Sequence, residues 1–544
     1  SANNGITMAG NLAATGTGTL EIDADEDNNG SGILTINNGV AVSTANQTIF
    51  MDAADFVVNG TGSINSGSGE ITLMPSSNVT MGIGTGAGIF SVDNTDLAAI
   101  STTGTLVLGS DVRDSAVTAD AVAAGAKNLS IKTNSTINDS DDTGDSITTS
   151  GTLTLRSNGI IGSLGGVEGL NINVGTLVIT ATGGNNAKVT DSGGNGSTTY
   201  QLTSGSPGDM TVTQETGDLV VDSISTDGDV FLTATAGNII DNADDALADV
   251  TADDLTMTAN ASGKGVGTSN GSFDTNVATI TLNVGSGGAL IADTGSFTLN
   301  ASTLASGASL NLAAVSGLTI GGNIAATGSG TLTFDADSDD NAAGDFTINN
   351  GVTVSTVNQA VGVTADDIVI TGTGAINAGS GAVNVTPSTA LSIGLGDGAG
   401  DFSLSSAEIG QITTSGTLTI GSASLASAVT MGNVSAGSKN VTVTTNGTID
   451  DSDDFSDHFT TSGTLTLRSN GAIGGANAEG LNINVGTFAL TTSNGNAVTV
   501  TDSGANGNTT LSSVLTGGAG VITYSMAAND ILVGTVTTTG SVTF

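Results

Sequence analysis

Hydrophobic and polar residues alternate along most of this chain with a period of two. In the segment 151–156, Leu153 and Leu155 fall on one side of an extended chain, whereas Thr152 and Thr154 fall on the other. Asn-Gly, Ser-Gly, Thr-Gly and Asp-Gly pairs, which tolerate positive φ angles, separate such segments. The pattern predicts strands of about five residues joined by tight turns. It recurs at 170–174, 177–180, 255–258, 280–284, 297–300 and 368–370.

The chain also repeats itself over a long distance. The sequence TSGTLTLRSNG occupies residues 149–159 and again 461–471, which is 312 positions later, and INNGV occurs at 36–40 and 348–352. We therefore divide the chain into a first copy (residues 1–232), an unduplicated stretch (233–312) and a second, partial copy (313–544). The register slips by one position before EGLNINVGT and recovers by Gly208 and Gly520. Internal duplication on this scale indicates a solenoid or an array.

Two all-β architectures fit short strands and tight turns. A β-sandwich ends after roughly 100–250 residues and should leave linkers between domains, but no linker interrupts the uniform composition. A parallel β-helix stacks coil on coil around a narrow aliphatic interior, which suits an aromatic content of 3%. We therefore predict one continuous β-solenoid over residues 1–544. Coils of roughly 20–25 residues would give about 25 coils and a length of about 120 Å. Ala-rich pieces at 119–126 and 244–248 allow at most one helical turn.

The repeated segments resemble a known family. TSGTLTLRSNGIIG, TSGTLTLRSNGAIG, TDSGGNGSTT and ATAGNIID are similar to the haemagglutinin-type repeats of filamentous-haemagglutinin-like bacterial surface exoproteins. The resemblance covers essentially the whole chain. It implies a right-handed parallel β-helix, export to the cell surface, and service as a stalk, adhesin or filament. Because open strand edges pair with other chains, we expect this sequence either to be a piece of a longer repeat protein or to dock end to end with other copies.

The charge of the chain limits its partners. Acidic residues number 51 and basic residues 8, which gives a formal net charge of −43. Nucleic acid is excluded as a partner, because phosphate binding needs clustered Lys and Arg. The sequence contains no apolar run long enough to cross a bilayer, so no membrane insertion is expected. A chain this acidic repels itself, and bound cations or high salt would favour its compact state.

Acidic residues cluster in ways that suggest calcium. Alternate aspartates at a tight turn gather the hard oxygen ligands that Ca²⁺ prefers, and two such clusters occur in both copies. The alternative is that they are solvated turns whose charges only repel. The candidate metal ligands are Asp23, Asp25 and Asp27 with their counterparts Asp335, Asp337 and Asp339, and Asp139 and Asp141 with their counterparts Asp451 and Asp453. A third acidic cluster lies at 241–254, in the unduplicated stretch.

Catalysis has little support in the sequence. The chain has no cysteine, and its one histidine, His458, aligns with Ser146 in the first copy. The basic residues kept in both copies are Lys127 with Lys439 and Arg156 with Arg468. Arg156 and Arg468 each end a strand on its outward side, where stacking with a neighbouring acidic coil is the simplest role. We therefore expect no enzyme, and no catalytic or cofactor-binding residues.

These observations favour a mechanical function. We expect an extracellular structural protein that forms a rigid surface fibre, sheath or stalk by stacking and self-association. The alternative is a cell-surface adhesin that binds a host, a neighbouring cell or a polysaccharide. A polysaccharide-active β-helix enzyme is a third, less favoured reading, which rests on fold analogy alone.

Overall fold

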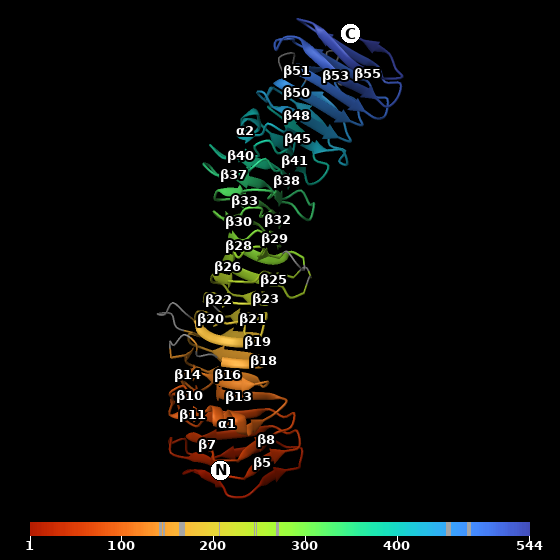
Figure 1. Ribbon diagram of the computed structural model, residues 1–544. Coiled ribbons are helices and arrows are strands. Elements are labelled where there is room, and N and C mark those ends of the chain that lie inside the picture. Colours follow the sequence, from red (N-terminus) through yellow and green to blue (C-terminus); the bar gives the residue numbers. More distant parts are fainter. Residues whose placement is uncertain are drawn as a thin grey trace. The chain divides into compact units, whose positions relative to one another are not determined.

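The computed structural model describes residues 1–140, 144, 147–162, 169–205, 207–243, 245, 247–267, 271–452, 458–475 and 480–544. Nearly all of their regular secondary structure is strand, and the strands pair in parallel in successive coils (Figure 1). The result is a β-solenoid of about 21 turns. The prediction of an all-β parallel solenoid is confirmed, whereas its handedness stays a prediction. The coils group into two compact units, Ser1–Val277 and Ala278–Phe544.

The number of turns is lower than expected because some coils carry insertions. In the first unit, Leu20 of β3 (Leu20–Asp23) pairs with Ile49 of β6 (Ile49–Ala53), and the acidic loop lies between them. A still longer stretch of chain separates Ile71 of β9 (Ile71–Pro75) from its partner Leu106 of β13 (Thr105–Ser110). The period-two pattern fixes the strands but not the length of chain between them.

The first unit shows how the alternating residues form a core. Strands β13, β16 (Asn128–Thr133), β18 (Ile147–Ser157), β19 (Leu170–Ala181) and β21 (Thr198–Ser204) pair in parallel one after another. One inward column consists of Leu106, Leu129, Leu153, Leu177 and Tyr200, and each of these side chains is fully buried. Stacking large apolar side chains on one another in this way removes apolar surface from water at every coil.

The second unit repeats this arrangement. Strands β45 (Thr417–Ser422), β48 (Asn440–Thr445), β50 (Phe459–Ser469), β51 (Leu481–Thr492) and β53 (Thr509–Thr516) pair in the same order (Figure 1). Their inward column consists of Leu418, Val441, Leu465, Phe488 and Leu511. The two copies thus share both strands and core positions, with aliphatic and aromatic residues exchanged at two of the five positions.

Buried hydroxyl groups link one coil to the next at the corners. Thr149 Oγ1 donates to the carbonyl oxygen of Lys127 in the preceding coil (2.6 Å) and accepts from Gly151 N (3.0 Å). Thr461 does the same in the second copy, with Lys439 O (2.7 Å) and the amide of the next glycine (3.0 Å). The side chains of Thr149 and Thr461 are fully buried. The corner hydroxyls therefore provide hydrogen-bond partners for backbone carbonyl and amide groups that have none in the strand ladders. Thr102, Ser157, Thr226, Thr414, Thr445 and Ser469 form equivalent pairs of bonds.

Two short helices interrupt the coils at positions that the sequence pattern did not predict. Helix α1 (Asn94–Ala99) begins after Asp93 and α2 (Ser406–Gln411) begins after Ser405, and each has a complete capping box. The missed signal was a cap residue followed three positions later by an acid. The Ala-rich piece at 119–126 instead lies mostly in β14 (Val117–Asp120) and β15 (Val122–Gly125), and the piece at 244–248 lies partly outside the described residues.

We predict that Thr149→Val destabilises the first unit locally by about 1–3 kcal/mol, because the substitution keeps the shape of the side chain but leaves the Lys127 carbonyl and the Gly151 amide without their partner. Hydrogen exchange of amides in β16 and β18, measured with the thermal melting curve, reports this loss. The matched control is Thr154→Val, whose side chain faces outward from β18. Equal exchange rates in the two variants would show that the buried hydroxyl is unimportant.

Candidate functional site

The first acidic loop follows β3 in the first unit. Asp25 is fully buried there, and its Oδ2 accepts from Ser76 Oγ (2.6 Å) and from Gly30 N (2.8 Å). Asp23 Oδ1 accepts from the Asp25 amide (3.1 Å), while Asp27 is exposed and bonds within the loop. Burial raises the pKa of Asp25, but its hydrogen bonds, of which those from Ser76 and Gly30 have the largest effects, together hold this pKa below its ordinary value. Asp25 therefore closes its own loop and ties it to the later coil that carries Ser76.

The second copy builds the same loop after β35 (Leu332–Asp335). Asp337 is fully buried, and its Oδ2 accepts from Ser388 Oγ (2.5 Å) and from Ala342 N (2.9 Å). Asp335 Oδ1 accepts from the Asp337 amide (3.4 Å), and Asp339 bonds within the loop. The three aspartates thus have three separate roles in both copies. Within the described part of the chain, no three acidic or histidine side chains converge in a way that could hold a metal ion.

The second predicted pair of clusters is only partly described. Asp139 Oδ2 accepts from the Asn171 amide of β19 (3.0 Å), and Asp451 Oδ2 accepts from the Asn482 amide of β51 (2.9 Å). Both carboxylates are almost fully buried. Asp141 and Asp453 lie outside the described residues. Calcium binding at any of these loops stays a prediction.

We expect excess calcium to raise the thermal melting midpoint relative to EDTA if the loops bind the ion. Sodium chloride at the same ionic strength separates a bound ion from general screening of the negative charge. The double variant Asp27→Asn/Asp339→Asn should lose the calcium-specific part of the shift, because it removes the exposed carboxylate from both loops. Glu70→Gln, another exposed acid, serves as control. A midpoint that calcium and EDTA leave unchanged would end the calcium hypothesis.

A further group of buried acids lies in the unduplicated stretch. Asp249 Oδ2 accepts from Asp274 N (2.9 Å), and the carboxylate of Asp274 accepts from Ser272 Oγ (2.8 Å). Asp241, Asp249 and Asp274 are all at least nine-tenths buried. Burial raises the pKa of Asp249 to about 8, and the negative charges of Asp241 and Asp274 add to the effect. The sequence pattern did not place Asp274 in this cluster, because it lies well beyond the other acids along the chain.

This group predicts a pH dependence of stability. The folded-state pKa of Asp249 is about 8 and its ordinary value is 3.8. The folded state therefore holds a proton that the unfolded state has lost, so Asp249 stabilises the fold below about pH 4 and this contribution is lost as pH rises through about 8.

Asp249→Asn should flatten the fall in stability between pH 4 and 8, by up to about 1.4 kcal/mol per pH unit. An asparagine still accepts from the Asp274 amide, so the fold should survive. Hydrogen exchange of β26 (Val250–Ala259) against pH measures the slope locally. Asp27→Asn, at an exposed position, should leave this slope unchanged. The assignment to Asp249 is wrong if both variants keep the wild-type slope.

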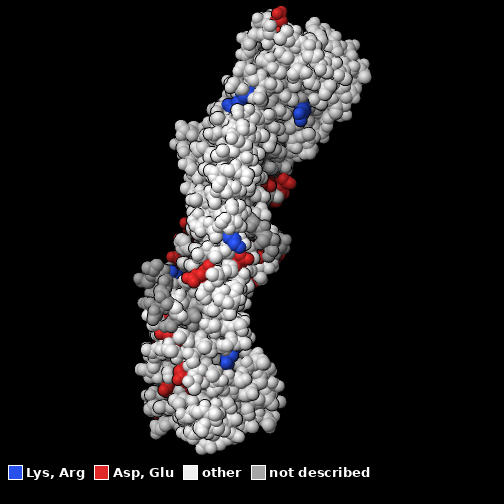
Figure 2. All heavy atoms as spheres, viewed as in Figure 1, with Lys and Arg blue, Asp and Glu red and all other residues white. Residues whose placement is uncertain are grey.

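The repeated basic residues have structural surroundings. Arg156 forms an ion pair with Asp111 (Nε to Oδ2, 2.9 Å), as expected for an outward side chain beside an acidic coil. The position equivalent to Asp111 in the second copy is Ala423, so Arg468 has no such acid there. Burial lowers the pKa values of Lys127 and Lys439. Basic residues are sparse on the face shown in Figure 2, and acidic groups are scattered among uncharged residues.

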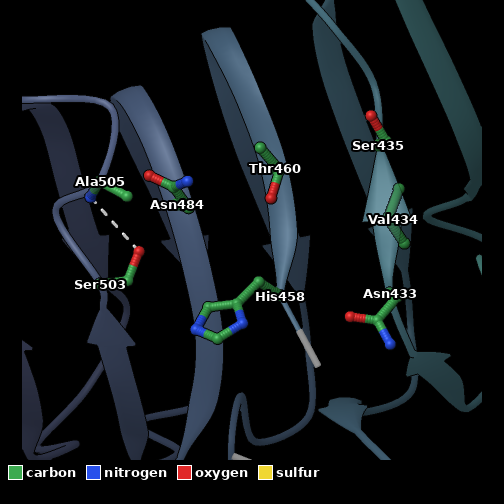
Figure 3. Close-up of a pocket in the computed structure, with 8 residues that line it drawn as sticks. All are labelled: Asn433, Val434, Ser435, His458, Thr460, Asn484, Ser503 and Ala505. Atoms are coloured by element: carbon green, nitrogen blue, oxygen red, sulfur yellow. Dashed lines mark hydrogen bonds between the residues drawn. The ribbon is translucent and has the colours of Figure 1, made fainter. Parts of the chain in front are cut away.

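A groove of about 440 Å³, lined mostly by residues with polar side chains, crosses successive coils of the second unit (Figure 3). It extends from β47 (Val434–Ser435) across β50 and β51 to the turn after β52 (Val498–Asp502). Ser435, Thr460 and Asn484 occupy paired positions on the first three of these strands. His458 lies just before β50 and is half-buried, and its ring points away from β47 towards β51 (Figure 3). The sequence pattern did not reveal the groove, because residues from separate coils form it.

Comparisons of the chain with known protein families, with curated proteins and with solved structures gave no match. The fold defines the chain as a β-solenoid repeat protein. In the described residues, no helix has the length and apolar character needed to span a membrane.

Proposed function

We propose that this chain is a non-enzymatic extracellular structural protein of the filamentous-haemagglutinin-like kind, which forms a rigid surface fibre, sheath or stalk. In this proposal the solenoid is right-handed, and it stacks and associates with other copies of itself. The load along the solenoid axis is carried by the backbone ladders, which run from coil to coil without side-chain chemistry.

The observation that carries this proposal is what the two copies have in common. Their shared polar residues bond from one coil to another. Asp96 of α1 accepts from Val58 N (2.9 Å), and Glu408 of α2 accepts from Ile370 N (3.2 Å), at equivalent positions of the two copies. The buried aspartates and threonines described above follow the same rule. The polar residues that the two copies share are thus the ones that hold the coils together. This is expected if the function of the chain is to form a stable stack of coils.

A further link recurs in both copies across two coil intervals. Asn195 Nδ2 donates to Thr149 O (3.1 Å) in the first unit, and Asn506 Nδ2 donates to Thr461 O (3.2 Å) in the second. Each asparagine amide nitrogen also donates to the carbonyl oxygen of an asparagine in the intervening coil, Asn173 (2.9 Å) or Asn484 (2.8 Å). One side chain therefore ties three coils together, which resists shear between them.

Electron microscopy of the native material tests this proposal. We expect polymers at the cell surface, and fibre diffraction from them should show a meridional spacing of about 4.8 Å from the stacked coils. Isolated rods anchored singly to cells would instead support the adhesin alternative. Purified chain in EDTA, in calcium and in sodium chloride of equal ionic strength shows whether screening of the −43 charge permits association. Dispersed particles in every condition and in the native material would contradict the proposal.

A further inference from the structure

The groove at His458 contains several side-chain polar groups that take no part in holding the coils together. The hydroxyl groups of Ser435 and Thr460 and the amide nitrogen of Asn484 have no hydrogen-bond partner among the described residues. Asn484 Oδ1 is already engaged, because it accepts from Asn506 N (2.8 Å). Successive coils lie about 4.8 Å apart, so these groups form a column at that spacing. The column is oriented along the solenoid axis and is open to solvent.

The described residues that line the groove carry few charges. Hydroxyl, amide and imidazole groups surround it, together with the small apolar side chains of Val434 and Ala505, and no Asp, Glu, Lys or Arg is among these described residues. A second groove of about 450 Å³ in the same unit does contain a carboxylate, that of Asp345. A neutral ligand is favoured over an anionic one, because the described lining offers an anion no Lys or Arg as counter-charge, and the Asp397 carboxylate, which accepts from Asn433 Nδ2 (3.2 Å), would repel it.

The backbone around the groove excludes one class of ligand. Strand β50 pairs with β47 on one side and with β51 on the other. An extended peptide binds to a sheet by adding a strand to an open edge. Strand β50 has no open edge, and the other side of β47 is occupied by Ser406 of α2, whose Oγ accepts from Ser435 N (3.1 Å) and donates to Asn433 O (2.8 Å). The ligand must therefore be recognised by side chains alone. Hydroxyl groups both donate and accept, and the free amide nitrogen donates, so the matching ligand carries many hydroxyl groups of its own.

The two copies share four of the residues that line the groove, which we call its framework, and differ in three others. Val434, Thr460, Asn484 and Ser503 correspond to Val122, Thr148, Asn173 and Ser192 in the first copy. By contrast, Asn433, Ser435 and His458 correspond to Ala121, Ala123 and Ser146. The second copy therefore places two additional polar groups and an imidazole on a scaffold that both copies share. Figure 3 shows the side-chain oxygen of Asn433 directed towards the side of the groove where His458 lies.

We propose that this groove binds a neutral oligosaccharide lying along the solenoid axis, with Ser435, Thr460 and Asn484 contacting successive sugar residues. The volume of about 440 Å³ accommodates a short stretch of such a chain and leaves its ends in solvent. Val434 and Ala505 offer small apolar surfaces to the C–H groups of the sugar rings. The site belongs to the second copy and does not depend on assembly of the protein into polymers.

Calorimetric titration of the full chain tests the proposal. The probes are neutral hexasaccharides of glucose, galactose, mannose and N-acetylglucosamine, with a hexamer of galacturonate as the anionic counterpart. We expect at least one neutral probe to bind and the galacturonate hexamer not to bind. Thr460→Ala and His458→Ser should each raise the Kd at least ten-fold, whereas Thr460→Ser should retain binding because it keeps the hydroxyl group.

The first copy supplies the matched control. Thr148→Ala removes the equivalent hydroxyl from the groove framework that lacks the additional polar residues, and it should leave the Kd unchanged. Absence of binding to every neutral probe overturns the proposal, as does a Thr148→Ala effect equal to that of Thr460→Ala. Binding of the galacturonate hexamer as tightly as a neutral probe also overturns it. Titration of dispersed chains gives this answer whether or not the native protein forms fibres.

Discussion

The strands of each coil pair in parallel with the strands of the coil before it. Each coil must therefore bring its strands into hydrogen-bonding register with that coil. A parallel ladder satisfies the backbone within the strands but leaves carbonyl and amide groups over at the corners. Buried hydroxyl groups such as that of Thr149, and buried carboxylates such as that of Asp25, bond to these groups. The corners thus account for many of the Ser, Thr and Asp side chains that are buried in a chain whose interior is otherwise apolar.

The same constraint explains how the two copies diverge. Core positions exchange one apolar residue for another, as Leu177 and Phe488 do, without disturbing the ladder. Corner residues are retained because each satisfies a backbone group in a neighbouring coil. Outward positions need neither to pack in the core nor to bond to the backbone of a neighbouring coil. At such positions the second copy has additional polar residues, such as Ser435. A specific binding groove can therefore develop on one copy while the framework of both stays intact.

Negative charge opposes this architecture in two ways. Exposed carboxylates repel one another across the surface, and buried ones such as Asp249 carry a cost of desolvation that raises the pKa. Lower pH weakens both the surface repulsion and the cost of burying a carboxylate. Screening by cations weakens the surface repulsion. The stability of the solenoid and the tendency of copies to associate should therefore respond to the same conditions, which links the folding of the chain to its proposed role outside the cell.

The sequence by itself determined the strands, the turns, the duplication and the all-β solenoid, because period-two alternation and Gly-containing turns are local signals. Only the tertiary structure decided which residues serve the corners. The local pattern makes Asp25 a candidate metal ligand and gives Thr149 no role, yet both are buried, since their partners lie 51 and 22 residues away. The groove at His458 was missed for a related reason, whereas the helices at 94–99 and 406–411 carry a local capping signal that the period-two pattern does not contain. Coil length and the meeting of separate coils depend on how the corners fold, and periodicity within a strand carries no information about them.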